Sequence, residues 1–188
     1  MFNLKLKSDS DLEALFCVEA VAIVCKGCEE VQLPSIDLNA KLCAIGVSRP
    51  VLGVVGAFYV CNLDYFEVSM RLHKDLFDKC SRILVFSCGA GVQQLSSFFR
   101  GKEVFPLCDT SLLQGYQGVT PSQFDCALCG DCHLNKTAAI CPITSCAKSL
   151  INGACGGTKD GKCEVDNEME CGWEHINKRI NMHKGASN

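Results

Sequence analysis

The sequence has few of the residues on which many enzymes and nucleic-acid-binding proteins depend. Among its 188 residues there are four histidines and one tryptophan, and the formal net charge is −3. No dense block of lysine and arginine occurs, which makes nucleic acids and anionic membrane surfaces poor candidate ligands. The longest apolar stretch, Pro50 to Cys61, is shorter than the ~20 residues that span a bilayer.

The chain is also short, and no catalytic set can be recognised in it. A complete (β/α)₈ barrel needs ~250 residues, so we do not expect a self-contained barrel enzyme. We find neither a paired acid and base nor a nucleophile with a histidine. The N-terminal segment carries Asp9, Asp11 and Glu13 instead of the basic start and apolar run of an export signal. We therefore expect a soluble, cytoplasmic protein.

Cysteine is what the sequence has in abundance, with 16 residues. The hydrophobic fraction of 48% and the charged fraction of 21% are those of a globular chain. In a reducing compartment, cysteines at close C-x-x-C spacing are more often metal ligands than disulfide partners. We therefore expect most of these thiols to be ligands.

The first part of the chain has the pattern of an α/β fold. Short runs rich in valine and isoleucine are typical of buried parallel strands, and helical spacing occurs between them. The predicted strands are Ala20–Val24, Pro50–Val60, Arg82–Phe86 and Glu103–Pro106, and the predicted helical segments are Leu63–Lys79 and Gln93–Arg100. This order predicts a small, mostly parallel sheet with covering helices.

The composition changes near residue 110, which suggests two domains. We expect an α/β domain over residues 1–109, a linker over 110–125, and a loop-rich, metal-binding cysteine domain over 126–188. A short amphipathic helix is predicted at Trp173–Met182, either capping the cysteine domain or contacting a partner.

Several cysteines of the α/β part follow predicted strands. In parallel sheets, binding sites lie outside the carboxyl ends of the strands. We therefore expect Cys25, Cys28, Cys61 and Cys88 to bind one [4Fe–4S] cluster, with Cys108 as an alternative fourth ligand. A thioredoxin-like dithiol at CKGC is a weaker alternative, as is a dinucleotide-binding loop at SCGAGVQQL.

The remaining cysteines of this part, Cys17, Cys43 and Cys80, lie in apolar or helical stretches. They are expected to be packing residues.

The C-terminal part carries the more specific pattern. Its eight cysteines are Cys126, Cys129, Cys132, Cys141, Cys146, Cys155, Cys163 and Cys171. A C-x-x-C-x-x-C run followed by Cys-Pro is typical of ferredoxins, but here eight residues separate Cys132 from Cys141. Eight thiolates suffice for one or two [4Fe–4S] clusters, for Zn²⁺, or for one centre of each kind. The spacing leaves open which thiols share a centre, and His133 or His175 could replace a thiolate.

The stretch from Cys126 to about Ile180 closely resembles the methylenetetrahydrofolate reductase C-terminal domain family. The matching motifs are C-x-x-C-G-D-C, C-P-x-x-x-C-x-K, N-G-x-C-G-G, D-G-x-C-E-V and C-x-W. The CKGC and LVFSCGAGVQ segments resemble the same family. Ala154 replaces a common proline, a change that affects turn stiffness and not ligation.

The resemblance implies the small, cysteine-rich subunit of a two-subunit methylenetetrahydrofolate reductase of acetogenic and related anaerobic bacteria. It implies iron–sulfur clusters, with zinc at one site as an option, that pass electrons to the flavin of a larger catalytic subunit. Further electron-donor subunits are expected partners, and Asp131, Lys148, Lys162 and Glu164 are candidate neighbours of the ligands. The alternatives are a structural zinc subunit and a corrinoid- or methyl-transfer accessory protein.

Overall fold

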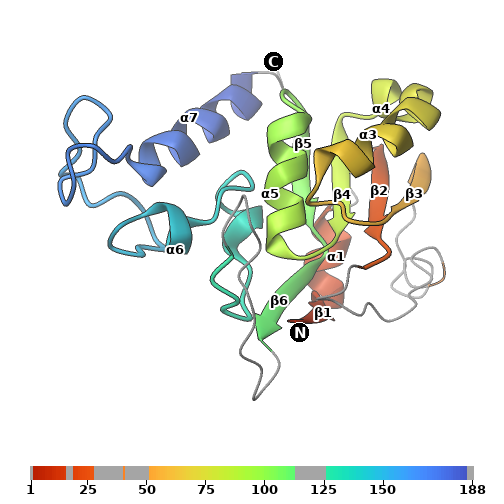
Figure 1. Ribbon diagram of the computed structural model, residues 1–188, viewed down its shortest axis with the longest axis horizontal. Helices are drawn as coiled ribbons and strands as arrows, with labels where there is room; N and C mark the ends of the chain where they lie inside the picture. Colours follow the sequence, from red (N-terminus) through yellow and green to blue (C-terminus); the bar gives the residue numbers. More distant parts are fainter. Residues whose placement is uncertain (1, 16–18, 28–39, 41–50, 113–125, 186–188) are drawn as a thin grey trace.

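A four-stranded parallel sheet forms the centre of the α/β part. The computed structural model describes residues 2–15, 19–27, 40, 51–112 and 126–185. The strands are β2 (Ala20–Cys25), β3 (Gly53–Ala57), β4 (Arg82–Phe86) and β5 (Glu103–Pro106), in the order β3-β2-β4-β5 (Figure 1). All four predicted strands and the predicted parallel sheet are confirmed. Because the chain moves from β2 outward to β3 and then returns to β4 on the other side, the switch point lies between β2 and β4.

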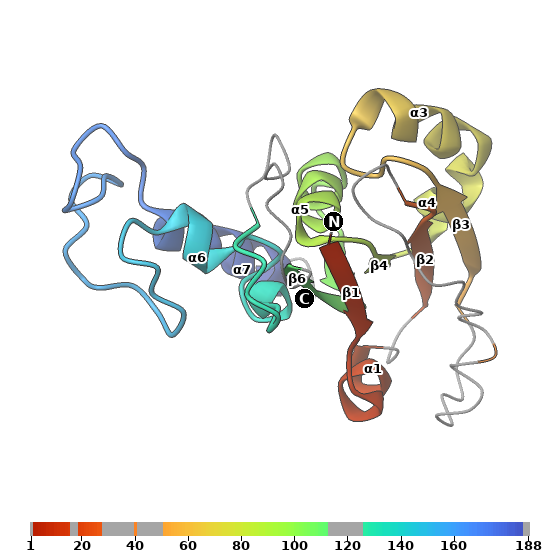
Figure 2. The ribbon, with the colours of Figure 1, turned by 60° about the horizontal axis from the view of Figure 1, so that its bottom comes forward.

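Helices cover both faces of this sheet. On one face lie α3 (Leu63–Leu72), α4 (Lys74–Lys79) and α5 (Gly89–Phe98), and on the other lies α1 (Asp9–Leu15) (Figure 2). The helical segment expected over Leu63–Lys79 is interrupted at His73, whose φ of −119° and ψ of 25° end α3 and start α4.

Helix α5 begins at Gly89, four residues before the predicted start. Its glycines have low helix propensity, which is why the sequence pattern missed this turn. The structure explains why glycine is present: a Cβ atom on Gly91 would lie 2.3 Å from the Ser87 hydroxyl.

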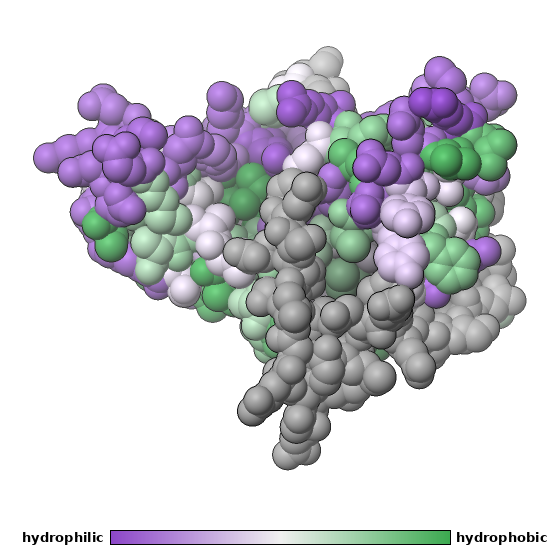
Figure 3. Space-filling view, viewed as in Figure 1, coloured by the Kyte–Doolittle hydropathy of each residue, from purple (hydrophilic) through white to green (hydrophobic). Residues whose placement is uncertain are grey.

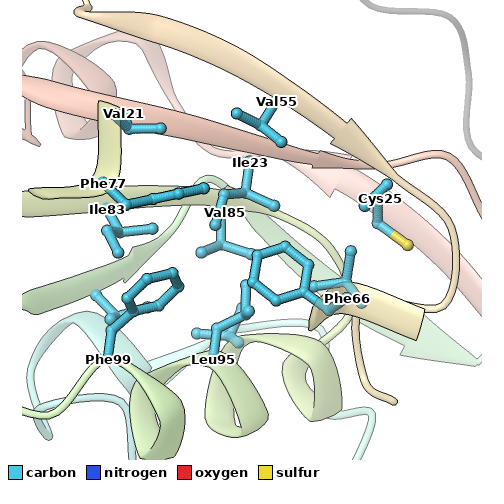
Figure 4. Close-up of a cluster of buried hydrophobic side chains, with 14 of the residues drawn as sticks. Val21, Ile23, Cys25, Val55, Phe66, Phe77, Ile83, Val85, Leu95 and Phe99 are labelled. Atoms are coloured by element: carbon cyan, nitrogen blue, oxygen red, sulfur yellow. The ribbon is translucent and has the colours of Figure 1, made fainter. Parts of the chain in front are cut away.

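The main core lies between the sheet and helices α3, α4 and α5. Val21, Ile23, Ile83 and Val85 point from the strands toward the aromatic rings of the helices (Figure 4). Phe66 is fully buried, and its ring meets Phe77, Phe98 and Phe99 edge to face at centroid distances of 6.1 to 6.3 Å. The central strands β2 and β4 therefore bury both faces, as is typical of parallel sheets, whereas the edge strand β3 exposes Val54 on one face.

A second, two-stranded sheet was not anticipated from the sequence. Strand β1 (Phe2–Leu6) pairs antiparallel with β6 (Cys108–Leu112), with Lys5 opposite Asp109. Residues 110–112 of the expected linker thus belong to β6, and residues 113–125 lie outside the described residues. The ribbon joins α1 in a separate core on the second face of the large sheet.

The C-terminal segment lies beside the sheet and is mostly loops (Figure 1). Its helical elements are a 3₁₀ turn at His133–Asn135, α6 (Pro142–Ser145) and α7 (Gly172–Gly185), which includes the predicted helix Trp173–Met182. Its own apolar core is small, with Trp173 and Ile176 buried beside Cys171. Among the described residues, no helix has the length and apolar character needed to cross a membrane.

Hydrophilic residues dominate the visible surface over α7, and hydrophobic residues gather over α3 and α4 (Figure 3). Helix α3 exposes Tyr65, Val68 and Leu72, the last at 76% of its accessible surface. Since these residues occur at helical spacing, they lie on one face of α3.

The substitution Phe66→Ala should lower the free energy of unfolding of the metal-free protein by about 3–5 kcal/mol, because it removes a fully buried ring and leaves a cavity. Urea denaturation followed by circular dichroism measures the change. Val68→Ala, on the exposed face of the same helix, is the matched control and should change stability by less than about 0.5 kcal/mol. Equal effects of the two substitutions would contradict this account of the core.

Candidate metal centres

Four cysteines of the C-terminal segment line one small cavity at the junction with the α/β part. They are Cys126, Cys129, Cys132 and Cys141. The cavity also touches Gly89 and Gln93 of α5 and Thr110 of β6, and its volume is about 20 Å³. This is room for roughly one water-sized occupant.

Strand β6 holds the loop that carries the first three of these cysteines. The backbone N–H of Gly130 donates to the carbonyl of Thr110 at 3.1 Å, and the N–H of Cys132 donates to the Asp109 carboxylate at 2.9 Å. Ser111 and Cys129 form an isolated antiparallel bridge. The loop is thus fastened along three consecutive residues of β6.

Helix α5 closes the cavity from the other side. The N–H of Gly89 donates to the Thr110 hydroxyl at 3.1 Å, and the Gln93 side chain accepts from the N–H of Cys141 at 3.2 Å. A Cβ atom on Gly89 would lie 3.0 Å from the sulfur of Cys126, so glycine permits this close approach. The first turn of α5 therefore faces the thiols, where its partial positive charge favours thiolates.

Burial and hydrogen bonding act in opposite directions on these thiols. Burial raises the pKa of Cys126 to about 12 and that of Cys132 to about 11. The backbone N–H groups of Leu128 and Leu134, each two residues beyond its cysteine, donate to the sulfurs and oppose this rise in pKa. Hydrogen bonds of this kind stabilise thiolates and the negative charge of a thiolate-bound metal centre.

The other four cysteines line a second cavity, built entirely from the C-terminal segment. They are Cys146, Cys155, Cys163 and Cys171, and the cavity volume is about 10 Å³. The N–H of Cys163 donates to the Met169 carbonyl at 2.9 Å, and the indole N–H of Trp173 donates to the Leu150 carbonyl at 2.9 Å. These bonds fold the glycine-rich loops around the thiols.

Two sulfurs of the second cavity also accept hydrogen bonds. The N–H of Gly157 lies 3.5 Å from the sulfur of Cys155, and the Thr158 hydroxyl lies 3.2 Å from that of Cys171. Burial would raise the pKa of Cys171, but Thr158 and the N–H groups at the start of α7 outweigh it and lower that pKa. The side chains of Lys148 and Glu164 line the same cavity and form an ion pair.

The donor sets fit metal ions or clusters that bind four thiolates. Each cavity presents four cysteines, and sulfurs in both accept N–H or O–H hydrogen bonds. In the described part of the chain, no three His, Cys, Asp or Glu side chains are already gathered closely enough to hold a metal ion. Binding would therefore draw the sulfurs of a cavity together.

The cysteines predicted to form a site at the strand ends occupy different surroundings. Cys25 packs in the core under α3 and α5, whereas Cys88 packs on the opposite face of the sheet and lies near Cys126. Cys61 follows β3 and is partly exposed, and Cys28 lies outside the described residues. A cluster held by these four residues stays a prediction.

The remaining predicted residues can also be located. Cys108 is buried, its thiol donates to the Ser87 carbonyl at 3.0 Å, and burial raises its pKa. Cys80 packs in the main core, as expected for a packing residue. His133 lines the first cavity, and His175 forms an ion pair with Glu170 at 2.8 Å. Cys17 and Cys43 lie outside the described residues.

Sequence reasoning missed Thr110, which lines the first cavity, and also Lys7 and Asp109, which hydrogen-bond to the backbone of Cys132. They are ordinary polar residues far from the cysteine motif in sequence. Only the pairing of β1 with β6 brings them to the thiols, and no short motif encodes that pairing.

The fold and the two cavities define a small α/β protein with a cysteine-rich C-terminal segment. Residues 105–188, slightly less than half of the chain, match the family described as "Methylene-tetrahydrofolate reductase C terminal". The match confirms the family resemblance of the cysteine motifs and begins upstream of them, at β5. No curated protein and no solved structure matches the chain.

In the metal-free protein, Cys126 should be alkylated much more slowly than Cys129. The thiolate is the reactive form, and with the pKa of Cys126 raised to about 12, only on the order of one thiol in ten thousand is ionised at pH 8. Cys129 is exposed. Timed iodoacetamide pulses followed by peptide mass spectrometry measure both rates.

The pH dependence of the Cys126 alkylation rate tests the same expectation in a second way. Since pH 7 to 9 lies well below the pKa of Cys126, its alkylation rate should rise about tenfold per pH unit without levelling off. Alkylation of Cys126 as fast as that of Cys129, or a plateau below pH 9, would contradict the buried position of this thiol.

Proposed function

We propose that this protein is the iron–sulfur electron-transfer subunit of a methylenetetrahydrofolate reductase complex. It would pass electrons to the flavin of a partner catalytic subunit that reduces methylenetetrahydrofolate to methyltetrahydrofolate. The observation that carries the proposal is the division of eight cysteines into two four-cysteine cavities within the part that matches the reductase family.

Four thiolates in each cavity are the ligand set of a [4Fe–4S] cluster. Cys126, Cys129, Cys132 and Cys141 would hold one centre, and Cys146, Cys155, Cys163 and Cys171 the other. Such clusters supply one-electron transfer, whereas a flavin can exchange electrons singly or in pairs. A third cluster at Cys25, Cys28, Cys61 and Cys88 is part of the proposal but has no support from the described residues.

The chain's own residues would set the charge balance of each centre. Backbone N–H groups of Leu128 and Leu134 donate to sulfurs of the first cavity, and Thr158 donates to Cys171 in the second. Hydrogen bonds to sulfur stabilise the more negative, reduced state and raise the reduction potential. Cys126, Cys132 and Cys141 are partly buried, whereas Cys129 is exposed.

The proposal places the folate chemistry in the partner subunit. The apolar side chains that α3 exposes support association with another protein, because contiguous exposed apolar residues often mark interfaces. The electron-donor subunits would contact the same complex.

A structural zinc subunit is the second candidate, and one observation favours it for the second cavity. The apolar core beside this cavity contains few buried residues, with Trp173 and Ile176 as its main members. A four-cysteine zinc site can replace such a core, because the free energy of metal binding becomes folding free energy. Zinc in the second cavity and an iron–sulfur cluster in the first would agree with the two four-cysteine cavities and with the small apolar core beside the second.

Protein purified without oxygen should contain iron and acid-labile sulfide and should absorb visible light in a band that dithionite bleaches. Cys132→Ser and Cys163→Ser should each remove the metal of one centre, which is about half of the total with two centres and about a third with three, because each substitution takes one of four ligands from a different cavity. Metal and sulfide analysis per chain, with electron paramagnetic resonance of the reduced protein, provides the measurement.

Cys80→Ala is the matched control, since Cys80 lies in the main core and outside both cavities. It should retain the full metal content. A colourless protein that contains only zinc would reject the electron-transfer function and leave the structural zinc subunit.

A further inference from the structure

A partly buried ion pair from the β1–β6 ribbon contacts the backbone of Cys132, one of the cysteines that line the first cavity. Lys7 follows β1, and only 7% of its side-chain surface is exposed. Its ammonium group donates to the Asp109 carboxylate at 2.7 Å and to the carbonyl of Cys132 at 3.3 Å. Lys5, two residues earlier on β1, is exposed.

The same carboxylate also binds the other polar backbone atom of Cys132. Oδ1 of Asp109 accepts from the N–H of Cys132 at 2.9 Å and from Lys7. The N–H and the carbonyl of this one cysteine are therefore both held by the Lys7–Asp109 pair. Since these two bonds restrain the backbone on either side of the Cys132 Cα atom, they restrain the direction of its side chain.

Partial burial of the Lys7–Asp109 ion pair carries a desolvation cost. Removing two charges from water costs several kcal/mol, and the attraction between them repays it only when the geometry is good and further hydrogen bonds are satisfied. The two bonds to Cys132 provide that satisfaction. The antiparallel pairing of β1 with β6 needs no ion pair, because backbone bonds join the strands from Phe2 to Leu6.

We infer that Lys7 and Asp109 are positioning residues of the first cysteine cavity, which hold Cys132 so that its thiolate can complete a four-thiolate metal site. This inference rests on the metal-binding part of the proposed function and not on iron or electron transfer. Lys7 and its strand lie outside the segment that matches the reductase family.

The test is an anaerobic titration of the metal-free full chain with Co²⁺, whose thiolate charge-transfer absorption grows with the number of coordinated thiolates. The wild-type protein should bind two Co²⁺ ions with four-thiolate absorption. In Lys7→Met, one of the two ions should bind about tenfold more weakly, a loss of about 1.4 kcal/mol. The charge-transfer absorption of that ion should fall to about three-quarters of its wild-type value, because one of its four thiolates is displaced.

Asp109→Ala and Asp109→Asn separate positioning from general destabilisation. Alanine removes the acceptor for the Cys132 N–H and should weaken the same ion. Asparagine keeps an oxygen acceptor and should retain the four-thiolate absorption. Lys5→Met removes an exposed lysine from the same strand and should match the wild type. If Lys7→Met fails to fold, the two Asp109 variants still give the comparison.

Wild-type affinity and absorption in both Lys7→Met and Asp109→Ala would overturn the inference. Equal losses in Asp109→Ala and Asp109→Asn would also overturn it. A wild-type protein that binds no Co²⁺ through these thiols would remove the metal-binding basis of both proposals. Two four-thiolate Co²⁺ sites in a protein that acquires no iron or sulfide would reject electron transfer and leave the role of Lys7 and Asp109 intact.

Discussion

The hydrogen bonds that β6 makes to the first cysteine loop join the two parts of this molecule. Asp109 accepts from the N–H of Cys132, and the backbone and hydroxyl oxygens of Thr110 accept from Gly130 and Gly89. The same strand pairs with β1 along its other edge. A five-residue strand thereby determines where the cysteine loop lies relative to helix α5. Leu134 and Ala139, which are buried in the main core, add apolar contacts between the same two parts.

The arrangement of the large sheet could be predicted because its central strands, β2 and β4, are buried on both faces. Runs such as Arg82–Phe86 are continuously apolar after the first residue, and a parallel sheet covered by helices requires this pattern. The small sheet could not be predicted, since Phe2–Leu6 alternates with polar residues and Cys108–Leu112 is largely polar. Each strand is stabilised by the other and by the loop packed against it, and such long-range pairing leaves no local signal.

The cysteine spacing of the C-terminal part predicts metal binding, but it does not predict how the structure groups the thiols. Cys141 and Cys146 are neighbours in sequence, yet they line different cavities because α6 lies between them. The side-chain directions of the cysteines at the strand ends could not be predicted for a different reason. Residues that follow adjacent parallel strands share one edge of the sheet, but they can point to opposite faces, as Cys25 and Cys88 do.

Different structural elements form the two cavities. This difference affects how a metal centre would assemble in each of them. The first draws on β6, α5 and the cysteine loop, so its frame rests on elements that pack on the main apolar core. The second is enclosed by glycine-rich loops and α7 beside a core of few residues. Since the free energy of metal binding must replace missing apolar burial there, folding and metal uptake are more tightly linked at the second cavity. The first cavity is the one that the α/β part can hold in shape before a metal arrives.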